Sequence, residues 1–591
     1  MKKIYIFIVS MLFVFGVKGQ HWTGLLQTEN PTFFETQDAF NQYWEPYNVV
    51  NGKYIENGAE KKAHGWKQFK RWEWFWEPRV DEDGLFPASD VNLTEWQNYL
   101  DANPEVLNNT SSNWTYWGAS FTSPSEPSIG VGRLNCIAFH PTNANIFWVG
   151  SPAGGLWKTI DGGSSWSTTT DNLPVMGVSD IAIDHTNTNI IYIATGDGDN
   201  GSITGDTKSM GVYKSIDGGN TFNQTDLNWS VTEEKTIRRL LIDPVNPQVL
   251  IAATSDGIWR TGNGGATFTE VESGPFKDIE FKPFNSSYVY GTTYYDGSNP
   301  NTKIFRSINN GVTWSQVASF PSGEVIRSNI AVSQAQPDLL DIVTVNTSRG
   351  FHGLYYSTNS GASGTFYNNS AGASYTYNSN GDCTAATGNL LGARYDATSC
   401  AGQGNYDLAF ATNPNDPNEM WLGGVNTWKS TDGGTNWSLM TMGNSCPNPL
   451  SWCYNPNNVL VQHADKHFFA FHPITNDIYE CNDGGLFVSS DGGVSWTNKS
   501  DGLGIGQIYR IGGLSSISNH VITGLQDNGT KELFNNLWYE SPPGGDGMEC
   551  IIDPTNGNIQ YAAVQYGTIY KTTDGWTTKN IIVNRVIKHI Y

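Results

Sequence analysis

The segment Glu480–Trp496, ECNDGGLFVSSDGGVSW, contains the hairpin on which the fold depends. Phe487, Val488 and Trp496 are aromatic or β-branched residues, which favour strands. Between them lies Asp491-Gly492-Gly493, a turn signal, because glycine adopts positive φ and an aspartate side chain accepts hydrogen bonds from the amides of its own turn. The segment therefore predicts two strands joined by a tight turn.

The same hairpin recurs along the chain, with variations on the pattern Ser-x-Asp-x-Gly-x-Ser/Thr-Trp. The further copies are Thr159–Trp166, Ser215–Phe222, Thr261–Phe268, Ser307–Trp314 and Ser430–Trp437, with degenerate copies at Ser357–Phe366 and Thr572–Trp576. Such repetition is typical of a repeat architecture.

These hairpins resemble the Asp-box (BNR) repeats of sialidases, sortilin-type receptors and xyloglucan-cleaving endoglucanases, all of which are β-propellers. The resemblance covers roughly residues 130–580. It implies that the box residues are structural turns on a rim away from the ligand. The aspartates concerned are Asp161, Asp217, Asp432 and Asp491.

Each hairpin belongs to a unit of four expected strands. In the first unit these are Cys136–His140, Ile146–Ser151, Gly155–Thr159 and Ser165–Thr170. Short strands bounded by turn signals predict an all-β fold, here a β-propeller of four-stranded blades with about nine units. Nine exceeds the usual range of roughly four to eight blades. Two arrangements stay open: one large sortilin-like wheel, or a seven-bladed wheel followed by the beginning of a second, as in the xyloglucan-cleaving enzymes.

Residues 1–19 predict a secretory signal peptide. Lys2 and Lys3 precede the apolar run Ile4–Val17, and a small-residue cleavage site precedes Gln20. A membrane anchor is the alternative, although the run is short for a spanning helix. We therefore expect an exported protein, secreted or at the cell surface, without membrane insertion after cleavage.

Residues 20–125 form a separate, aromatic-rich segment with a small helical content. Apolar residues at three- and four-residue steps predict a helix over Lys61–Glu77, which Pro78 ends, and a second helix is expected at Asn92–Leu100. The aromatic stripe could bind sugar, but packing against the propeller is the favoured interpretation. The phrase Gly65–Glu73, GWKQFKRWE, resembles the N-terminal segment of many proteins exported by type IX secretion. The propeller would then occupy residues 126–591, and the sequence is expected to be truncated at its C-terminus.

The net charge disfavours some classes of partner, and the cysteine count indicates the redox compartment. The formal net charge is −22, which disfavours nucleic acid and anionic membranes as partners. Seven cysteines fit an oxidising compartment. We expect Cys383–Cys400 and Cys446–Cys453 to close local loops as disulfides. Cys136 and Cys550 are expected to be buried thiols, and Cys481 is unassigned.

Chain direction places the boxes on one face of a propeller and the site on the other. His463, Asp465 and His467 enter an innermost strand there, where residues two apart point the same way. Two imidazoles and a carboxylate suit Zn²⁺, although such histidines also bond loop carbonyls or water. The ligand-binding candidates on this face are His463, His467, Asn482, Gln526 and Asn528.

The same face carries carboxylates with two possible uses. Glycoside hydrolysis needs two carboxyl groups across a cleft, and the catalytic candidates are Asp465, Asp483, Asp527 and Asp546. The alternative is that each carboxylate caps its own Gly-rich turn. We expect these four, with His463, to gather at one mouth of the central channel. The loop Thr195–Asp206 could hold Ca²⁺ through Asp197, Asp199 and Asp206, although it lacks the strict spacing of a calcium loop. No cofactor is certain.

The resemblance leaves two functions open. In the xyloglucan-cleaving enzymes a catalytic aspartate precedes Gly-Gly in the first blade, where this chain has Ala153. The second catalytic aspartate resembles Asp483. Because the Arg-Ile-Pro signature is missing, a sialidase is not expected. The favoured interpretation is a propeller that binds glycan, or a cell-surface or protein partner, on the face opposite its boxes. The alternative is a polysaccharide-active, endoglucanase-like glycoside hydrolase using paired aspartates.

Overall fold

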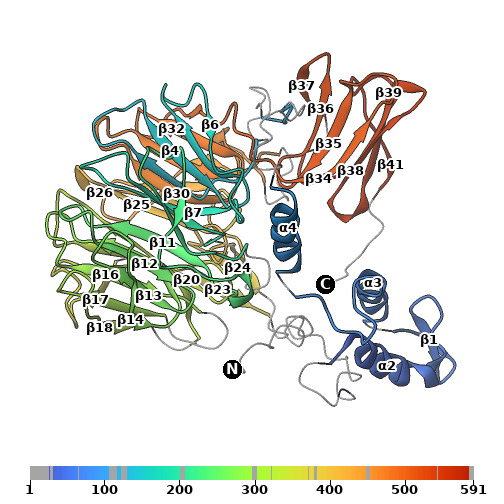
Figure 1. Cartoon of the computed structure of the whole chain (residues 1–591), viewed down its shortest axis with the longest axis horizontal. Coiled ribbons are helices and arrows are strands. Elements are labelled where there is room, and N and C mark those ends of the chain that lie inside the picture. The colour runs from blue at the N-terminus through green and yellow to red at the C-terminus, as the bar shows by residue number, and fades with distance from the viewer. Residues whose placement is uncertain are drawn as a thin grey trace. The chain divides into compact units, whose positions relative to one another are not determined.

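The computed structural model describes residues 26, 31–63, 65–88, 90–104, 116–120, 130–199, 207–295, 302–320, 323–369, 372–378, 383–446, 453–541 and 544–584. The chain divides into two compact units, Met1–Asn113 and Trp114–Tyr591 (Figure 1). The predicted signal peptide lies outside the described residues. None of the helices in the described part combines the length and the hydropathy of a membrane span.

The first unit is a small aromatic-rich body. Its elements are α2 (Phe33–Trp44), η2 (Glu45–Tyr47), β1 (Lys53–Glu56), β2 (Ala59–Lys62), α3 (Trp66–Trp76) and α4 (Val91–Ala102). The expected helix begins at Trp66 instead of Lys61, because residues 59–62 pair with β1 as a hairpin. The expectation for residues 92–100 agrees closely with α4.

The aromatic stripe of α3 packs inside this unit. Phe69 stacks on Phe40 of α2 with ring centroids 3.6 Å apart, and Trp66 contacts both Phe40 and Trp44. The sequence analysis missed α2 and therefore assigned the stripe to the propeller, which was wrong. The signal for α2 was present, since Thr32 and Glu35 form a capping box at its start.

The second unit contains, among its described residues, nine sheets of four or five strands. We call the first seven sheets the wheel. Their strands, sheet by sheet, are β3 (Cys136–Phe139), β4 (Phe147–Ser151), β5 (Gly155–Thr159), β6 (Ser167–Thr168); β7 (Val178–Ile183), β8 (Ile191–Thr195), β9 (Val212–Ser215), β10 (Asn223–Gln224); β11 (Ile237–Ile242), β12 (Leu250–Thr254), β13 (Gly257–Thr261), β14 (Thr269–Ser273); β15 (Phe276–Phe281), β16 (Val289–Thr293), β17 (Lys303–Ser307), β18 (Ser315–Ser319); β19 (Val325–Val332), β20 (Leu340–Asn346), β21 (Phe351–Ser357), β22 (Tyr367–Asn368); β25 (Ala409–Asn413), β26 (Asp416–Gly423), β27 (Thr427–Ser430), β28 (Ser438–Met442), β29 (Leu460–Val461); and β30 (Lys466–Phe471), β31 (Ile478–Asn482), β32 (Gly485–Ser489), β33 (Thr497–Asn498).

The last two sheets form what we call the C-terminal sheet pair. Their strands are β34 (Ile508–Gly513), β35 (Val521–Leu525), β36 (Thr530–Phe534), β37 (Leu537–Ser541); and β38 (Gly547–Asp553), β39 (Asn556–Val564), β40 (Ile569–Thr572), β41 (Asn580–Val583). A separate hairpin of β23 (Ser374–Tyr377) and β24 (Cys383–Thr387) and the short helices η3 (Val231–Glu233) and η4 (Gln565–Gly567) complete the described elements.

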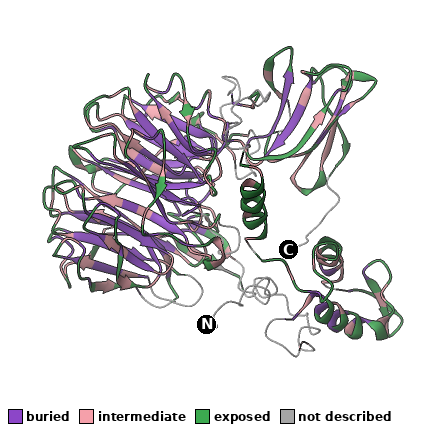
Figure 2. Ribbon diagram, in the orientation of Figure 1, coloured by how far each residue is buried: buried purple, intermediate pink, exposed green. Residues whose placement is uncertain are grey.

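The wheel closes on itself. The first strands of its sheets contact one another in the order β3, β7, β11, β15, β19, β25 and β30, and β30 contacts β3 again. In the C-terminal sheet pair, β34 and β35 pack against β38. This order of contacts favours the second expected arrangement, a closed wheel followed by further sheets. Figure 2 shows that the strands of the wheel are largely buried.

The box hairpins have the predicted turn chemistry. Asp491 accepts hydrogen bonds from the Ser489 hydroxyl at 2.9 Å and from the Ser495 amide and hydroxyl at 2.9 and 2.6 Å. Gly492 and Gly493 have φ of 72° and 94°, which a side chain would strain. Asp161, Asp217 and Asp432 make the corresponding bonds in their own turns. These contacts support a structural role for the box aspartates.

The first strands of five wheel sheets share a β-bulge near their start. The bulged residues are Ser179, Arg238, Lys277, Ile326 and His467, each of which the register skips. A bulge redirects a side chain relative to regular alternation. Two of the redirected side chains, those of Lys277 and His467, both contact Asp199.

Both expected disulfides are confirmed. Cys383 is bonded to Cys400 and Cys446 to Cys453. Cys136, Cys481 and Cys550 are buried free thiols.

Candidate functional site

A cavity of about 300 Å³ lies beside the β31–β32 and β35–β36 turns. We call it the mouth cavity. Its ionisable lining residues with Arg or Asp side chains are Arg133, Asp197, Asp483 and Asp527, and its other lining residues are Gly132, Pro152, Ala153, Thr207, Tyr406, Gln507, Gln526 and Asn528. The wheel and the C-terminal sheet pair both contribute to the lining, so the candidate site joins two parts of the second unit.

Asp483 follows β31 and is held by three partners. Its Oδ1 lies 2.8 Å from His467 Nε2, and its Oδ2 accepts a hydrogen bond of 2.8 Å from the Tyr406 hydroxyl. The Nε of Arg133 lies 3.7 Å from Oδ1. Burial by itself would raise the pKa of Asp483, but the charges of His467 and Arg133 outweigh it and hold the pKa below its ordinary value. Asp483 is therefore an ionised carboxylate.

Asp527 lies on the β35–β36 turn and has the opposite character. Its side chain accepts a hydrogen bond of 2.9 Å from Gln526 Nε2. Burial, and next the nearby charge of Asp483, raise the pKa of Asp527 to about 8. Its backbone amide donates to Asp546 Oδ1 at 2.9 Å. Asp546 thus accepts from the turn of Asp527, whereas the alternative interpretation expected each carboxylate to cap its own turn.

Asp465 precedes β30 with φ of 63°. It accepts a hydrogen bond of 3.0 Å from Gln403 Nε2, and burial followed by the charge of Asp483 raises its pKa to about 6. The neighbouring Asp407 is fully buried, and its pKa is raised well above the ordinary value by burial and by Asp465. A hydrogen bond thus connects the Asp527 amide with Asp546. The charge of Asp483 raises the pKa of both Asp465 and Asp527.

The remaining ligand-binding candidates are mostly engaged within the protein. His463 is buried, with its ring nitrogens 3.1 Å from the carbonyl oxygens of Ala464 and Asp527. Asn482 donates to Glu480 at 2.8 Å and accepts from the Gly484 amide at 2.9 Å. Asn528 donates to the Asp483 carbonyl at 3.0 Å and accepts from the Gly130 amide at 2.8 Å. Gln526 lines the mouth cavity.

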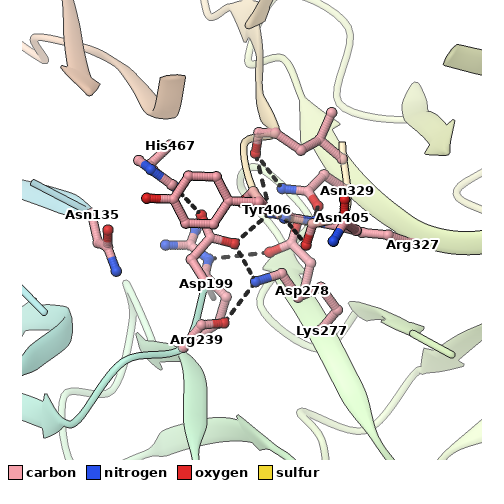
Figure 3. A network of polar contacts seen from close by, with 12 residues as sticks. Asn135, Asp199, Arg239, Lys277, Asp278, Arg327, Asn329, Asn405, Tyr406 and His467 are labelled. Carbon is pink, nitrogen blue, oxygen red and sulfur yellow. Dashed lines mark hydrogen bonds and ion pairs between the residues drawn. The ribbon is translucent and has the colours of Figure 1, made fainter. Parts of the chain in front are cut away.

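A second cavity, of about 230 Å³, lies among the first strands of the wheel and is lined by charged groups. We call it the channel cavity. Arg239 contacts Asp180 at 3.1 Å and Asp278 at 3.2 Å, and it also pairs with Glu280. Asp199 pairs with Lys277 at 2.5 Å and Arg327 at 2.6 Å (Figure 3). These ion pairs hold the pKa of Asp199 well below its ordinary value, although its burial acts in the opposite direction.

The structure does not support the zinc prediction. His463 bonds carbonyl groups, and His467 lies between Asp199 and Asp483. Within the described ranges, no group of three or more His, Cys, Asp or Glu side chains is arranged to hold a metal ion. The zinc triad was therefore wrong, because the three side chains do not share a direction.

The calcium prediction concerns a loop that is described only in part. Asp197 pairs with Arg133 at 2.9 Å, and Asp199 pairs with Lys277, Arg327 and His467. Asp206 lies outside the described residues. The two described carboxylates thus have cationic partners in place of an oxygen cage, and the calcium loop stays a prediction.

Sequence reasoning missed two residues that line the mouth cavity, Arg133 and Tyr406, and also Gln403, which donates to Asp465. Arg133 precedes the first strand of the wheel, whereas Gln403 and Tyr406 follow the insertion that Cys383–Cys400 closes. The Arg133 guanidinium lies 4.8 Å from the centre of the Tyr406 ring. Nothing in the repeat pattern marked these residues, but the disulfide-closed insertion on the site face was a usable signal.

Known proteins resemble parts of this chain. No family model matches it. Xyloglucanases are similar over segments of the chain: that of Acetivibrio thermocellus is 27% identical over 228 residues, or 33% of this chain and 26% of the relative. That of Hypocrea jecorina is 28% identical over 156 residues, or 24% of this chain and 18% of the relative. The matched segments thus span about a quarter or less of these relatives.

Solved structures agree on the architecture. The GH74 enzyme of Niastella koreensis has a TM-score of 0.53 at 17% identity, covering 78% of this chain and 67% of that one. The GH74 xyloglucanase of Xanthomonas campestris has a TM-score of 0.54 at 15% identity, covering 77% and 68%. At these identities the likeness concerns the fold. The chain is therefore a β-propeller protein with the architecture of GH74 enzymes.

Proposed function

We propose that the mouth cavity is the active site of a polysaccharide-active glycoside hydrolase. The observation that carries the proposal is that two carboxyl groups of opposite character, Asp483 and Asp527, line one cavity. The pKa of Asp527 is raised to about 8 and that of Asp483 is lowered. Environments that separate the pKa values of two carboxyl groups are typical of an acid and its partner base. The similarity to xyloglucanases supports a polysaccharide as the substrate.

The two carboxyl groups would divide the reaction between them. Asp527, protonated at neutral pH, would donate its proton to the glycosidic oxygen as the bond from the anomeric carbon to that oxygen breaks. Asp483, as a carboxylate, would stabilise the positive charge that develops on the sugar ring and accept a proton from the attacking water. One new hydroxyl on each fragment then accounts for the water consumed.

A second candidate function has its own supporting observation. Ala153 lines the mouth cavity at the position where the resemblance to xyloglucan-cleaving enzymes implies a catalytic aspartate. A methyl group cannot transfer a proton. A non-catalytic protein that binds a polysaccharide in this cavity is therefore the competing proposal, and the sortilin-like interpretation with a protein ligand belongs to the same class.

The deciding experiment is a screen for reducing-end release from plant polysaccharides, with xyloglucan included. We expect release by the natural protein, and a loss of about 10²- to 10⁴-fold in Asp527→Asn and Asp483→Asn. An Asp491→Asn variant in a box turn serves as the matched control. Binding without release in the natural protein, combined with release in Ala153→Asp, would support the binding candidate and contradict the hydrolase.

The pH profile is a second test. Because Asp527 must be protonated to act, the rate should fall as pH rises through about 8. The raised pKa of Asp527 also affects stability. An aspartate of the unfolded chain has a pKa of about 3.9, so between this pH and about 8 the native state binds more protons than the unfolded chain. Stability should therefore decline as pH rises from about 4 to 8, and less so in Asp527→Asn. Chemical denaturation at several pH values measures this effect without a substrate.

A further inference from the structure

His467 occupies an unusual position for a candidate ligand-binding residue. It is the bulged residue of β30, and its side chain is fully buried. Its Nδ1 lies 2.8 Å from Asp199 Oδ2 and its Nε2 lies 2.8 Å from Asp483 Oδ1. The imidazole ring therefore has a carboxylate at each nitrogen, and neither nitrogen is left for a ligand (Figure 3 shows the Asp199 side).

The chemistry of the ring decides its charge. A neutral imidazole has one N–H donor and one nitrogen with a lone pair. That second nitrogen would then lie against a carboxylate oxygen with no proton between the two acceptors. That conflict would vanish if one carboxyl group were protonated. Asp199, however, accepts from Lys277 and Arg327, and Asp483 accepts from Tyr406 with Arg133 nearby. Both carboxylates are thus held ionised, and only a doubly protonated ring donates to both.

We propose that His467 is a positioning residue that stays doubly protonated and fixes Asp483 as an oriented carboxylate in the mouth cavity. The proposal deepens the proposed function, on which its catalytic part rests. Asp199 and His467 line the channel cavity, and Asp483 lines the mouth cavity. His467 therefore connects the ion pairs of the channel to the candidate site by two charge-assisted hydrogen bonds, which are stronger than neutral ones.

The groups around His467 act in both directions on its charge. Burial and the Arg133 guanidinium lower its pKa, whereas the carboxylates of Asp483 and Asp199 raise it, and the pKa of His467 is raised overall. Lys277 and Arg327 donate to the Asp199 carboxylate, and the carboxyl group of Asp465 also interacts with the charge of His467. The Tyr406 ring packs edge-on against the imidazole with the two ring centroids 4.8 Å apart, and the His467 side chain is fully buried.

The direct test is the protonation state of the ring, measured by long-range ¹H–¹⁵N correlation on protein with labelled histidines. The chain has ten histidines, and His467→Gln identifies the signal. His472, directly after the same strand, is the matched control, because its Nδ1 accepts hydrogen bonds from the amides of Ile474 and Thr475 and is thus unprotonated. At pH 8 we expect both nitrogens of His467 and only one of His472 to carry a proton. A neutral His467 at pH 7 would overturn the proposal.

Variants separate the positioning role from simple structure. Asp199→Asn removes one of the two negative charges beside the ring, so the ring should then titrate within the accessible pH range. An unchanged, permanently charged ring in Asp199→Asn would contradict the argument from two carboxylates. This comparison needs no substrate and no catalysis.

Kinetics test the consequence for Asp483. In His467→Gln the cationic partner is lost, so the pKa of Asp483 should rise and the acid limb of the pH–rate profile should move to higher pH. We expect kcat to fall about tenfold with KM little changed, partial rescue in His467→Lys, and no effect in His472→Gln. An unshifted acid limb would reject the positioning role. If the natural protein releases no sugar, the proposed function fails while the protonation measurement still decides the charge of His467.

Discussion

At the scale of single residues, the box aspartates and the site aspartates have opposite solvent environments. Asp491 is solvent-exposed, and hydrogen bonds within its turn lower its pKa to about 2. Asp491→Ala removes the acceptor of three hydrogen bonds in that turn. We expect a melting temperature lower by a few degrees, because the donors of these bonds are left without their partner. Polysaccharide binding by the folded protein should not change. Calorimetry and a binding isotherm check both statements, and a loss of binding at an unchanged melting temperature would contradict the structural role.

Tyr406 shows how a single hydroxyl can matter in the mouth cavity. Tyr406→Phe removes the donor that lies 2.8 Å from Asp483 Oδ2 but keeps the ring beside His467 and Arg133. We expect kcat/KM to fall about tenfold, the cost of one hydrogen bond to a charged group, at a nearly unchanged melting temperature. Tyr395→Phe, in the disulfide-closed insertion that precedes Tyr406, is the control. Equal rates for Tyr406→Phe and the natural protein would exclude this role.

At the scale of elements, the bulge explains which part of the site could be predicted. Regular alternation placed His463, Asp465 and His467 on one side of a strand. In the structure β30 begins only at Lys466, Asp465 has positive φ, and His467 is the bulged residue. The gathering of the aspartates on one face depended only on strand order and could be predicted. The directions of individual side chains depended on bulges, which the repeat pattern does not reveal.

The disulfide-closed insertion is an element with a testable function. Cys383–Cys400 closes the loop that precedes Gln403 and Tyr406, which contact Asp465 and Asp483. Replacing both cysteines by serine frees a loop with a sequence separation of 17 residues. We expect a lower melting temperature, with a loss of at most about 3 kcal/mol, and a several-fold lower kcat/KM. The Cys446/Cys453 double variant is the control, and an equal kinetic loss in both would show that the first loop has no special role.

At the scale of the whole molecule, the units could be counted from the sequence but their closure could not. Most units share the same strand pattern and box turn, so the pattern alone does not tell which units are first and last in a closed wheel. Contacts between residues far apart in the chain decide this. The amide of Val131 donates to the Gly484 carbonyl, and that of Leu134 to the Asn482 carbonyl, so the start of the wheel is tied to its last sheet.

Asn528 extends this closure to the C-terminal sheet pair. Its side chain is 2% exposed, donates to the Asp483 carbonyl, and accepts from the Gly130 amide. One residue of the β35–β36 turn thus bonds both the start of the wheel and the turn that carries Asp483.

If the mouth cavity needs both parts, Asn528→Ala should cost about 1–3 kcal/mol of stability because two buried groups lose their partners. It should also lower kcat/KM more than Asn519→Ala, a control in the same sheet pair whose amide donates to Asn536 at the surface. Limited proteolysis should cut Asn528→Ala faster between the two parts, near residues 500–507. Rates and proteolysis that match those of Asn519→Ala would mean that the wheel forms the site without the C-terminal sheet pair.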